Sequence, residues 1–254
     1  MARQRVPEGP PAIPPVQKLR IRYAKRGRLR FSSTRDFQRA LERALRRAGV
    51  PMAFSAGFHP HPKISYANAA PTGTASEAEY VEISVVERVD TDALRAALDE
   101  ALPEGLDIVQ VVEARPGSLA DRLQASHWVL RFEGLSAAQL RPVIDTFLAA
   151  EQLEVTRVFK NGPRTFDVRA AVLDMQLEDA ADQAADHACA ILQMVVRHTT
   201  PAVRPDDVLT ALRTHAAFEP PRPPLVTRLS QGPLQPHAAQ VADPLADDPT
   251  TPAP

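Results

Sequence analysis

The sequence predicts an α+β protein made of two tandem ferredoxin-like (split βαβ) units, with antiparallel sheets, helices on one face of each sheet, and disordered termini. Segments that alternate apolar and polar residues, as strands do, are interleaved with segments whose apolar residues recur three and four apart, as in helices. Their order reads roughly β-α-β-β-α-β twice along the 254 residues, with one extra strand early in the first copy. The expected parts are a disordered leader over 1–16, a first unit over 17–116, a second unit over 117–230, and a disordered Pro-rich tail over 231–254.

The first unit is predicted to open with two basic strands joined by a hairpin turn. Residues 18–23 alternate apolar and basic side chains, which indicates a half-buried strand with a basic outer face. The turn over 25–28 contains Gly27 and leads into a shorter alternating segment over 28–31. The basic residues expected on the outer face of these strands are Arg20, Arg22, Arg28 and Arg30.

A helix is predicted next, because apolar residues form a single stripe from Phe37 to Ala48. Ser33 or Thr34 can cap its first turn, and the negative charge of Asp36 suits the positive N-terminus of a helix. Gly49 and Pro51 end the helix. Two of the arginines that lie off the apolar stripe, Arg35 and Arg39, extend the basic surface expected on the two strands.

The remaining periodic segments complete the two copies. Strands are predicted over 63–67, 80–86, 106–112, 127–132, 154–160, 165–173, 190–196 and 225–229. Helices are predicted over 91–102, 136–149 and 206–213.

The charge of the chain is unevenly distributed. Residues 1–68 hold fifteen of the 30 Lys and Arg residues but only three acids, Glu8, Asp36 and Glu42, for a local net charge of +12 within a chain whose total is −1. A basic region of this kind indicates a phosphate-rich partner, since phosphate contacts are made mainly by Lys and Arg. Abundant arginine could also reflect coding bias, which would not explain the shortage of acids.

Residues 57–65, which we call the arm, contain two X-Pro steps. Pro60 and Pro62 fix the backbone, and both preceding histidines are held extended. We expect Phe58 to anchor the arm at one end and Ile64 to join the sheet at the other. The arm should present its polar side chains beside the N-terminus of the first helix, where an anion could bind. The residues expected to bind nucleic acid or an anion here are Phe58, His59, His61 and Lys63, and those expected to support the arm are Asp36, Gly57, Pro60, Pro62, Glu77 and Glu79.

Several kinds of chemistry lack their motif in this sequence. The chain has no Walker loop, GxGxxG, CxxC, HxxxH or HExxH pattern, so we expect no cofactor and no metal. His59 and His61 could supply only two ligands of a metal site, with Asp36 or Glu77 completing it. The only cysteine, Cys189, is flanked by apolar residues and is expected to be buried and inert.

Two further interpretations of polar and aromatic residues remain open. Glu77 and Glu79 share one face of a predicted strand and could act as an acid–base pair, although we favour a solvated strand face as their explanation. Tyr66 and Phe58 could stack on bases, while alternation places Tyr23 in the core.

No run of residues approaches the roughly 18 apolar positions of a membrane span. The N-terminus lacks the apolar region of a secretory signal, and a single cysteine allows no internal disulfide. A cytoplasmic location without a membrane partner is therefore expected.

Three stretches, over residues 48–51, 54–65 and 76–80, resemble a bacterial family of unknown function known as the radical-SAM-associated, or radical-SAM-linked, domain. Members of that family occur fused behind a radical SAM enzyme or as a separate protein, and the separate form is the one expected for this chain. The resemblance is most specific from Gly57 to Lys63, where the family has Gly-Phe-x-Pro-His-Pro-Lys. It implies that the chain acts beside a radical SAM enzyme, since one cysteine cannot hold an iron–sulfur cluster.

The chain departs from the family at Thr34, because members tend to have a histidine two residues before the aspartate that is Asp36 here. Any chemical role of that histidine would be absent from this chain. The family lends no catalytic residues to the positions discussed above.

Three functions follow as expectations. The first is a non-catalytic accessory protein that binds RNA or another phosphate-rich substrate for a separate radical SAM enzyme. The second is a metal-independent RNA-processing enzyme in which His59 or His61 is the general base, since tandem ferredoxin-like folds also occur in CRISPR RNA endonucleases. The third is a protein-interaction module whose basic face meets an acidic partner.

Overall fold

The computed structural model describes residues 12–180, 188–235 and 239–252. The fold is mixed α+β with a large mixed sheet, and the chain divides into two compact units. Unit 1 comprises residues 1–72, 78–120 and 245–254, and unit 2 comprises residues 73–77 and 121–244. The C-terminal residues therefore belong to the same unit as β1.

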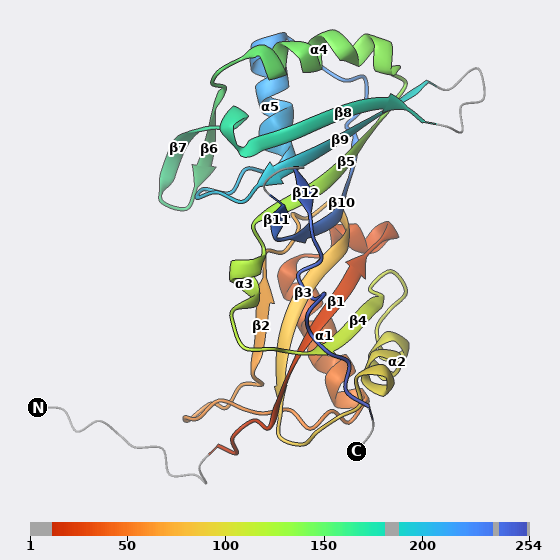
Figure 1. Cartoon of the computed structure of the whole chain (residues 1–254), viewed down its shortest axis with the longest axis vertical. Helices are drawn as coiled ribbons and strands as arrows, with labels where there is room; N and C mark the ends of the chain where they lie inside the picture. Colours follow the sequence, from red (N-terminus) through yellow and green to blue (C-terminus); the bar gives the residue numbers. More distant parts are fainter. Residues whose placement is uncertain (1–11, 181–187, 236–238, 253–254) are drawn as a thin grey trace, which may run out of the picture. The chain divides into compact units, whose positions relative to one another are not determined.

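Unit 1 is a layer of strands covered by two helices (Figure 1). Its strand order is β4-β1-β3, with β2 paired to β3, and both the β1–β4 and β2–β3 pairs are antiparallel. Its elements are β1 (Gln17–Lys25), the 3-10 helix η1 (Gly27–Phe31), α1 (Thr34–Arg47), β2 (Ile64–Ala67), β3 (Ala75–Val85), α2 (Thr91–Ala101) and β4 (Ile108–Glu113), followed by the short α3 (Leu119–Arg122), which ends in unit 2.

The predicted apolar stripe packs α1 on the sheet. Phe37, Leu41 and Leu45 are buried in the core of unit 1, and the ring of Phe37 stacks on that of Tyr23 with 3.8 Å between centroids. The helix begins after Ser33 in a capping box, in which the Ser33 hydroxyl accepts from the Asp36 amide. The assignments of this helix and of Tyr23 to the core are confirmed.

The predicted second strand over 28–31 is wrong, because this segment forms the 3-10 helix η1. Gly27 adopts a left-handed φ of 52°, and the chain then closes on itself through bonds from the Leu29 amide to the Arg26 carbonyl and from the Ser32 amide to the Leu29 carbonyl. Alternation over four residues is too short to distinguish a strand from such a turn.

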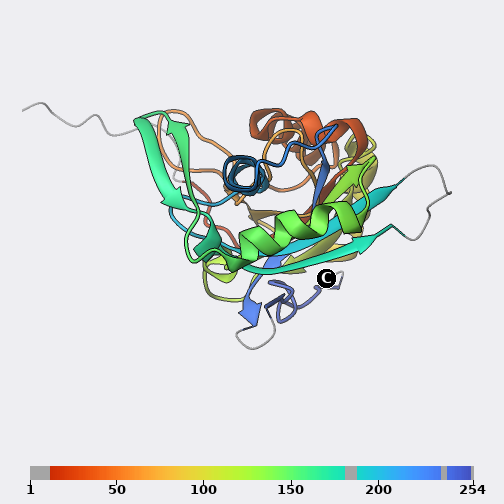
Figure 2. The same cartoon turned by 90° about the horizontal axis from the view of Figure 1, so that it is seen from above.

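Unit 2 has the strand order β10-β5-β9-β8, and each neighbouring pair is antiparallel. Figure 2 shows α4 lying across the strands, on the face where Trp128, Leu130 and Phe132 of β5 are buried. The elements are β5 (Ala125–Glu133), α4 (Ala137–Ala149), β6 (Glu154–Phe159), β7 (Gly162–Asp167), the 3-10 helix η2 (Arg169–Ala171), β8 (Val172–Asp179), β9 (Cys189–Arg197), α5 (Pro205–Ala216), β10 (Leu225–Gly232), β11 (Leu234–Gln235) and β12 (Gln240–Val241).

Two details of unit 2 differ from the prediction. The sheet is mixed rather than purely antiparallel, because Thr227 and Arg228 of β10 pair in parallel with Ala75 and Ser76 at the start of β3. The predicted strand over 165–173 is two strands, β7 and β8. The chain turns between them because the Asp167 carboxylate accepts bonds from the amides of Leu153 and Arg169.

A buried arginine network ties the C-terminal residues to the sheet of unit 1. The side chain of Arg20 on β1 has no exposed surface and donates to Glu82 at 3.0 Å, to both carboxylate oxygens of Asp248 at 3.0 and 2.7 Å, and to the Gly117 carbonyl at 2.7 Å. Burial alone would lower the pKa of Arg20, but its bonds to Asp248 and Glu82 outweigh that effect and raise it. Arg20 is therefore a structural cation inside the unit.

The expected disordered tail over 231–254 also needs correction for its described residues. The Pro249 carbonyl accepts from the Glu113 amide, Thr251 exchanges bonds with Thr91, and Leu245 is buried. A composition rich in proline and acids predicts disorder, but it cannot reveal that Asp248 has a buried guanidinium to pair with. Residues 1–11 of the expected leader, and 236–238 and 253–254 of the tail, lie outside the described residues.

No helix in the described part of the chain is long and apolar enough to cross a membrane.

Asp248→Ala is expected to destabilise unit 1 by roughly 3–5 kcal/mol, because it leaves the Arg20 guanidinium buried without its bidentate partner. Asp247→Ala removes the same charge from an exposed neighbouring position and should cost under about 0.5 kcal/mol. Chemical denaturation measures both effects, and exchange of the Thr251 amide reports release of the C-terminal residues. Equal stability of the two variants would show that the network does not hold the tail.

Candidate phosphate-binding surface and a polar pocket

The four arginines expected on one basic face are divided by the structure. Arg20 is internal, and Arg22 is half-buried on the same strand. Arg28 is exposed on η1, and the Arg30 guanidinium lies 4.7 Å from the centroid of the Phe31 ring. The expected face of two adjoining strands is therefore not formed, and of these four arginines only Arg28 is exposed.

The helix α1 carries a second set of arginines, and these are exposed. Arg35 and Arg39 lie near its N-terminus. The exposed set continues along the helix with Arg43, Arg46 and Arg47. Since the apolar stripe faces the sheet, the opposite face of α1 is a row of cations.

Ser33 and Asp36 at the N-terminus of α1 bond to each other and make no hydrogen bond to the arm in the described residues. Asp36 accepts from the Ser33 amide at 3.1 Å and from the Ser33 hydroxyl at 2.7 Å, and these bonds lower the pKa of Asp36. The first turn of α1 is capped by its own residues, which leaves fewer free N–H groups for an anion.

The arm is closed at its base like a short hairpin. The Lys63 amide donates to the Ala53 carbonyl at 2.8 Å, and Ser55 and His61 exchange two bonds, of 2.8 and 3.0 Å. Gly57 lies at the tip with a φ of 125°, which only glycine adopts readily. As expected, Ile64 joins the sheet by pairing with Ile83.

The tip of the arm presents its side chains to solvent. His59, His61 and Lys63 are exposed, as expected, but Phe58 is 61% exposed and does not anchor the arm. An exposed aromatic ring between a glycine and a histidine is available for stacking. Pro60 and Pro62 lie in the same loop, with Pro62 paired across it to Phe54.

The two glutamates expected to support the arm have different environments. Glu79 is buried and accepts from the Ala70 amide at 3.0 Å, in the turn that follows β2. Lys25, also buried, donates to the Ala70 and Pro71 carbonyls of that turn. Glu77 is half-buried. Glu79 therefore fixes the connection after β2, and its burial contradicts the solvated strand face considered from the sequence.

Tyr66 does not offer the stacking face considered from the sequence. Its ring packs edge-on against Phe37, with 6.1 Å between centroids, and is half-buried. Burial, together with the nearby charge of Glu42, raises the pKa of the Tyr66 hydroxyl.

The described residues contain no group of three or more His, Cys, Asp or Glu side chains arranged to hold a metal ion. Cys189 is buried, as expected. His187 and His237 lie outside the described residues.

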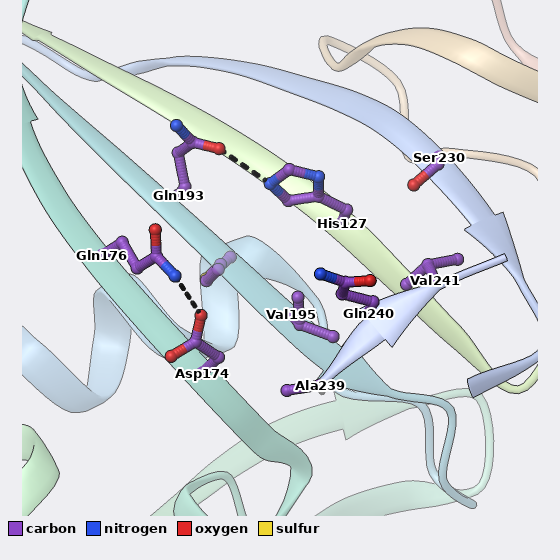
Figure 3. Close-up of a pocket in the computed structure, with 10 residues that line it drawn as sticks. His127, Asp174, Gln176, Gln193, Val195, Ser230, Ala239, Gln240 and Val241 are labelled. Atoms are coloured by element: carbon purple, nitrogen blue, oxygen red, sulfur yellow. Dashed lines mark hydrogen bonds between the residues drawn. The ribbon is translucent and has the colours of Figure 1, made fainter. Parts of the chain in front are cut away.

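A polar pocket of about 270 Å³ opens on unit 2 (Figure 3). Alternation along β5 places His127 on the opposite face of the sheet from the buried Trp128. Strands β5, β8, β9 and β10 form the floor, and β12 lies over part of it. The polar side chains that line it are His127, Asp174, Gln176, Gln193, Ser230 and Gln240. This site was not predicted from the sequence, although the alternation in β5 already separates His127 from the core.

Unit 2 also contains a serine–histidine pair. Ser126 lies 2.7 Å from Nε2 of His198, and Nδ1 of His198 lies 2.7 Å from the Leu123 carbonyl oxygen. Because a carbonyl only accepts, Nδ1 carries the proton and the Ser126 hydroxyl donates to Nε2. Ser126 is only 1% exposed, so the pair is a buried link rather than an accessible nucleophile. Burial lowers the pKa of His198.

The hairpin of β6 and β7 was not singled out from the sequence. The Arg157 guanidinium lies 4.6 Å from the centroid of the Phe159 ring and 5.1 Å from that of Phe166, and it pairs with Asp207 at 2.5 Å. The Arg164 guanidinium also lies over the Phe159 ring, 5.5 Å from its centroid. Cation–π contacts thus lie within the hairpin, and the ion pair between Arg157 and Asp207 connects it to α5.

Comparison with known families gives one match. The family described as "Uncharacterized protein conserved in bacteria (DUF2344)" matches residues 18–205. No curated protein matches the chain.

Three solved structures show a weak likeness to this chain. An unknown protein from Galdieria sulphuraria is 16% identical, with 80% of this chain and 93% of that chain covered and a TM-score of 0.24. A variant of DypB from Rhodococcus jostii RHA1 in complex with heme is 11% identical, with coverage of 87% and 93% and a TM-score of 0.21. The encapsulated DyP-type peroxidase from Mycobacterium smegmatis is 9% identical, with coverage of 86% and 92% and a TM-score of 0.20. Likenesses this weak carry no argument about function.

The buried His198 predicts a loss of stability in acid. Its pKa is lower when folded than the ordinary 6.5, so below that pH the unfolded chain binds a proton that the folded imidazole resists. The contribution of His198 to the free energy of unfolding should be fully present above pH 6.5 and should be lost as the pH falls towards the pKa of the folded protein. The loss is about 1.4 kcal/mol for each unit by which the folded pKa lies below the unfolded pKa.

His198→Gln cannot titrate and should flatten part of this dependence, whereas His215→Gln, at an exposed position, should not. The free energy of unfolding measured between pH 7.5 and 5 distinguishes the two variants. If the free energy of unfolding of His198→Gln and of the unchanged protein depended on pH in the same way, His198 would not cause the loss of stability in acid.

Proposed function

We propose that this chain, which belongs to the DUF2344 family of uncharacterized proteins conserved in bacteria, is a non-catalytic accessory protein that binds RNA or another phosphate-rich substrate for a separate radical SAM enzyme. The observation that carries the proposal is the row of exposed arginines on α1, in the same unit as the exposed arm. Cations and an aromatic ring are thus available within one compact unit.

The chemistry of these residues suits a single-stranded nucleic acid. Arginine guanidinium groups contact phosphates in bidentate fashion, and their positive charge gives affinity without sequence preference. The exposed ring of Phe58 and the imidazoles of His59 and His61 have faces on which unpaired bases can stack. The arm is closed by hydrogen bonds at its base and stiffened by Pro60 and Pro62, so little conformational entropy is lost on binding.

We also propose that each unit is a ferredoxin-like fold. Support comes from the order of elements in unit 1, β1-α1-β2-β3-α2-β4, and from its strand order, in which the first strand lies between the third and the fourth. Unit 2 has the same arrangement in β10-β5-β9-β8, with the β6–β7 hairpin inserted after its first helix. This is the split βαβ arrangement.

The radical SAM partner is proposed from the resemblance of residues 57–63 to the radical-SAM-linked domain. With Cys189 buried and no other cysteine in the chain, an iron–sulfur cluster would have to reside in the partner. Recovery of an iron–sulfur protein with the tagged chain from its own cells tests this part, and its repeated absence would remove the partner from the proposal.

Changing Arg35, Arg39 and Lys63 to Gln is expected to weaken binding of a single-stranded RNA and to flatten its salt dependence. Each lost phosphate contact removes about 0.7 from the slope of log K against log salt for single strands, so three contacts remove about 2. Fluorescence anisotropy at several salt concentrations measures both quantities.

The matched control changes Arg197, Arg213 and Arg222 to Gln, which removes the same charge from exposed positions of unit 2. If both triple variants flatten the slope of log K against log salt equally, the effect is one of net charge. The surface on α1 and the arm is then not the binding site. Cleavage of the RNA in the presence of EDTA would instead favour a metal-independent enzyme using His59 or His61. Retention of an acidic protein but no RNA would favour a protein-interaction module.

A further inference from the structure

We propose that the polar pocket of unit 2 binds a single nucleobase, through hydrogen bonds to the edge of the ring. This site is separate from the arginines of α1 and from the arm, and its test does not depend on them. The group that the pocket would recognise is a neutral heteroaromatic ring with amide or amidine edges. This ring is the same in a free nucleoside and in a nucleotide within RNA.

The pocket is built on rigid elements. His127 lies on β5, Gln176 on β8 and Gln193 on β9, and the three strands are hydrogen-bonded neighbours in register. Side chains fixed by neighbouring strands hold their positions more accurately than side chains on loops. Gln240 and Val241 of β12 lie over the floor, as Figure 3 shows, so that a ligand would be enclosed on more than one side.

A chain of hydrogen bonds sets the direction of the donors and acceptors on the floor. The Gln193 amide donates through Nε2 to Glu178 at 2.8 Å, which turns its Oε1 towards His127. Nε2 of His127 lies 3.0 Å from that oxygen and must therefore donate to it. In the neutral imidazole, Nδ1 is then left as an acceptor.

The second pair on the floor is fixed in the same way. Nε2 of Gln176 donates to Asp174 at 2.9 Å, which leaves Oε1 of Gln176 as an acceptor (Figure 3). Among the described residues, the side-chain amide of Gln240 and the hydroxyl of Ser230 have no protein partner. Both groups can therefore supply donors as well as acceptors to a ligand. A glutamine amide has the spacing to pair with an adenine edge, and a carboxylate can accept from a cytosine amino group.

The charge and the size of the pocket favour a base over a phosphate. No Lys or Arg lines it, and its one carboxylate, Asp174, would repel an anion. Val195 and Val241 give apolar surface for the face of a ring. A volume of about 270 Å³ is close to the lower limit of ligand pockets, near 300 Å³, and suits one ring system rather than a long chain.

The test titrates the full chain with adenosine, cytidine, guanosine and uridine, and follows the backbone amides by NMR together with calorimetry. We expect at least one nucleoside to shift the amides of the pocket strands. The double variant Gln176→Ala/Gln240→Ala should weaken that nucleoside about tenfold or more, because two hydrogen bonds are lost. Gln152→Ala removes an exposed glutamine elsewhere in unit 2 and should leave the affinity unchanged.

A second titration uses a short oligonucleotide of the same base and separates the two sources of the ring. If the oligonucleotide binds and the double variant weakens it as much as the nucleoside, the natural ligand is a nucleotide within RNA. If only the nucleoside depends on the pocket, the ligand is a free nucleoside. The proposal is overturned if no nucleoside shifts the pocket amides, or if the double variant binds as well as Gln152→Ala.

Discussion

The buried guanidinium of Arg20 is the interaction on which the rest of unit 1 depends. A cation without exposed surface is tolerated only when its charge and its N–H groups find partners, because the loss of hydration is otherwise too costly. Glu82 supplies one carboxylate from β3, and Asp248 supplies the other from a position 228 residues away in the sequence. The network therefore requires the C-terminal residues to return to the sheet that contains β1.

This requirement also determines which cations remain available at the surface. Arg20 is withdrawn from the basic first quarter of the chain, and Lys18 pairs with the other oxygen of Glu82 at 2.8 Å. The arginines of α1 keep their exposure, because the helix needs only its apolar stripe to pack. The cations on which the proposed function rests are thus those that the fold of unit 1 does not use internally.

Much of the architecture could be predicted from the sequence, because it depends on local periodicity. The stripe along α1, the cap at Ser33, the strand leading from Ile64 and most segments of unit 2 follow from spacing alone. The failures at Arg20 and in the C-terminal residues come from contact between residues distant in the sequence, whereas the wrong strand over 28–31 comes from alternation over too few residues. Arg20 alternates like a surface residue, and Asp248 lies in a segment whose composition suggests disorder. The pocket was missed for the same reason, since Gln193 and Gln240 become neighbours only when the sheet forms.

The most direct test of the proposed RNA-binding surface is hydrogen exchange of the full chain with and without a single-stranded RNA. We expect slower exchange in α1 and in the loop from Ala53 to Lys63 when RNA is bound, with little change in α2, which packs in the same core. Unchanged exchange in both segments, with protection confined to unit 2, would contradict it.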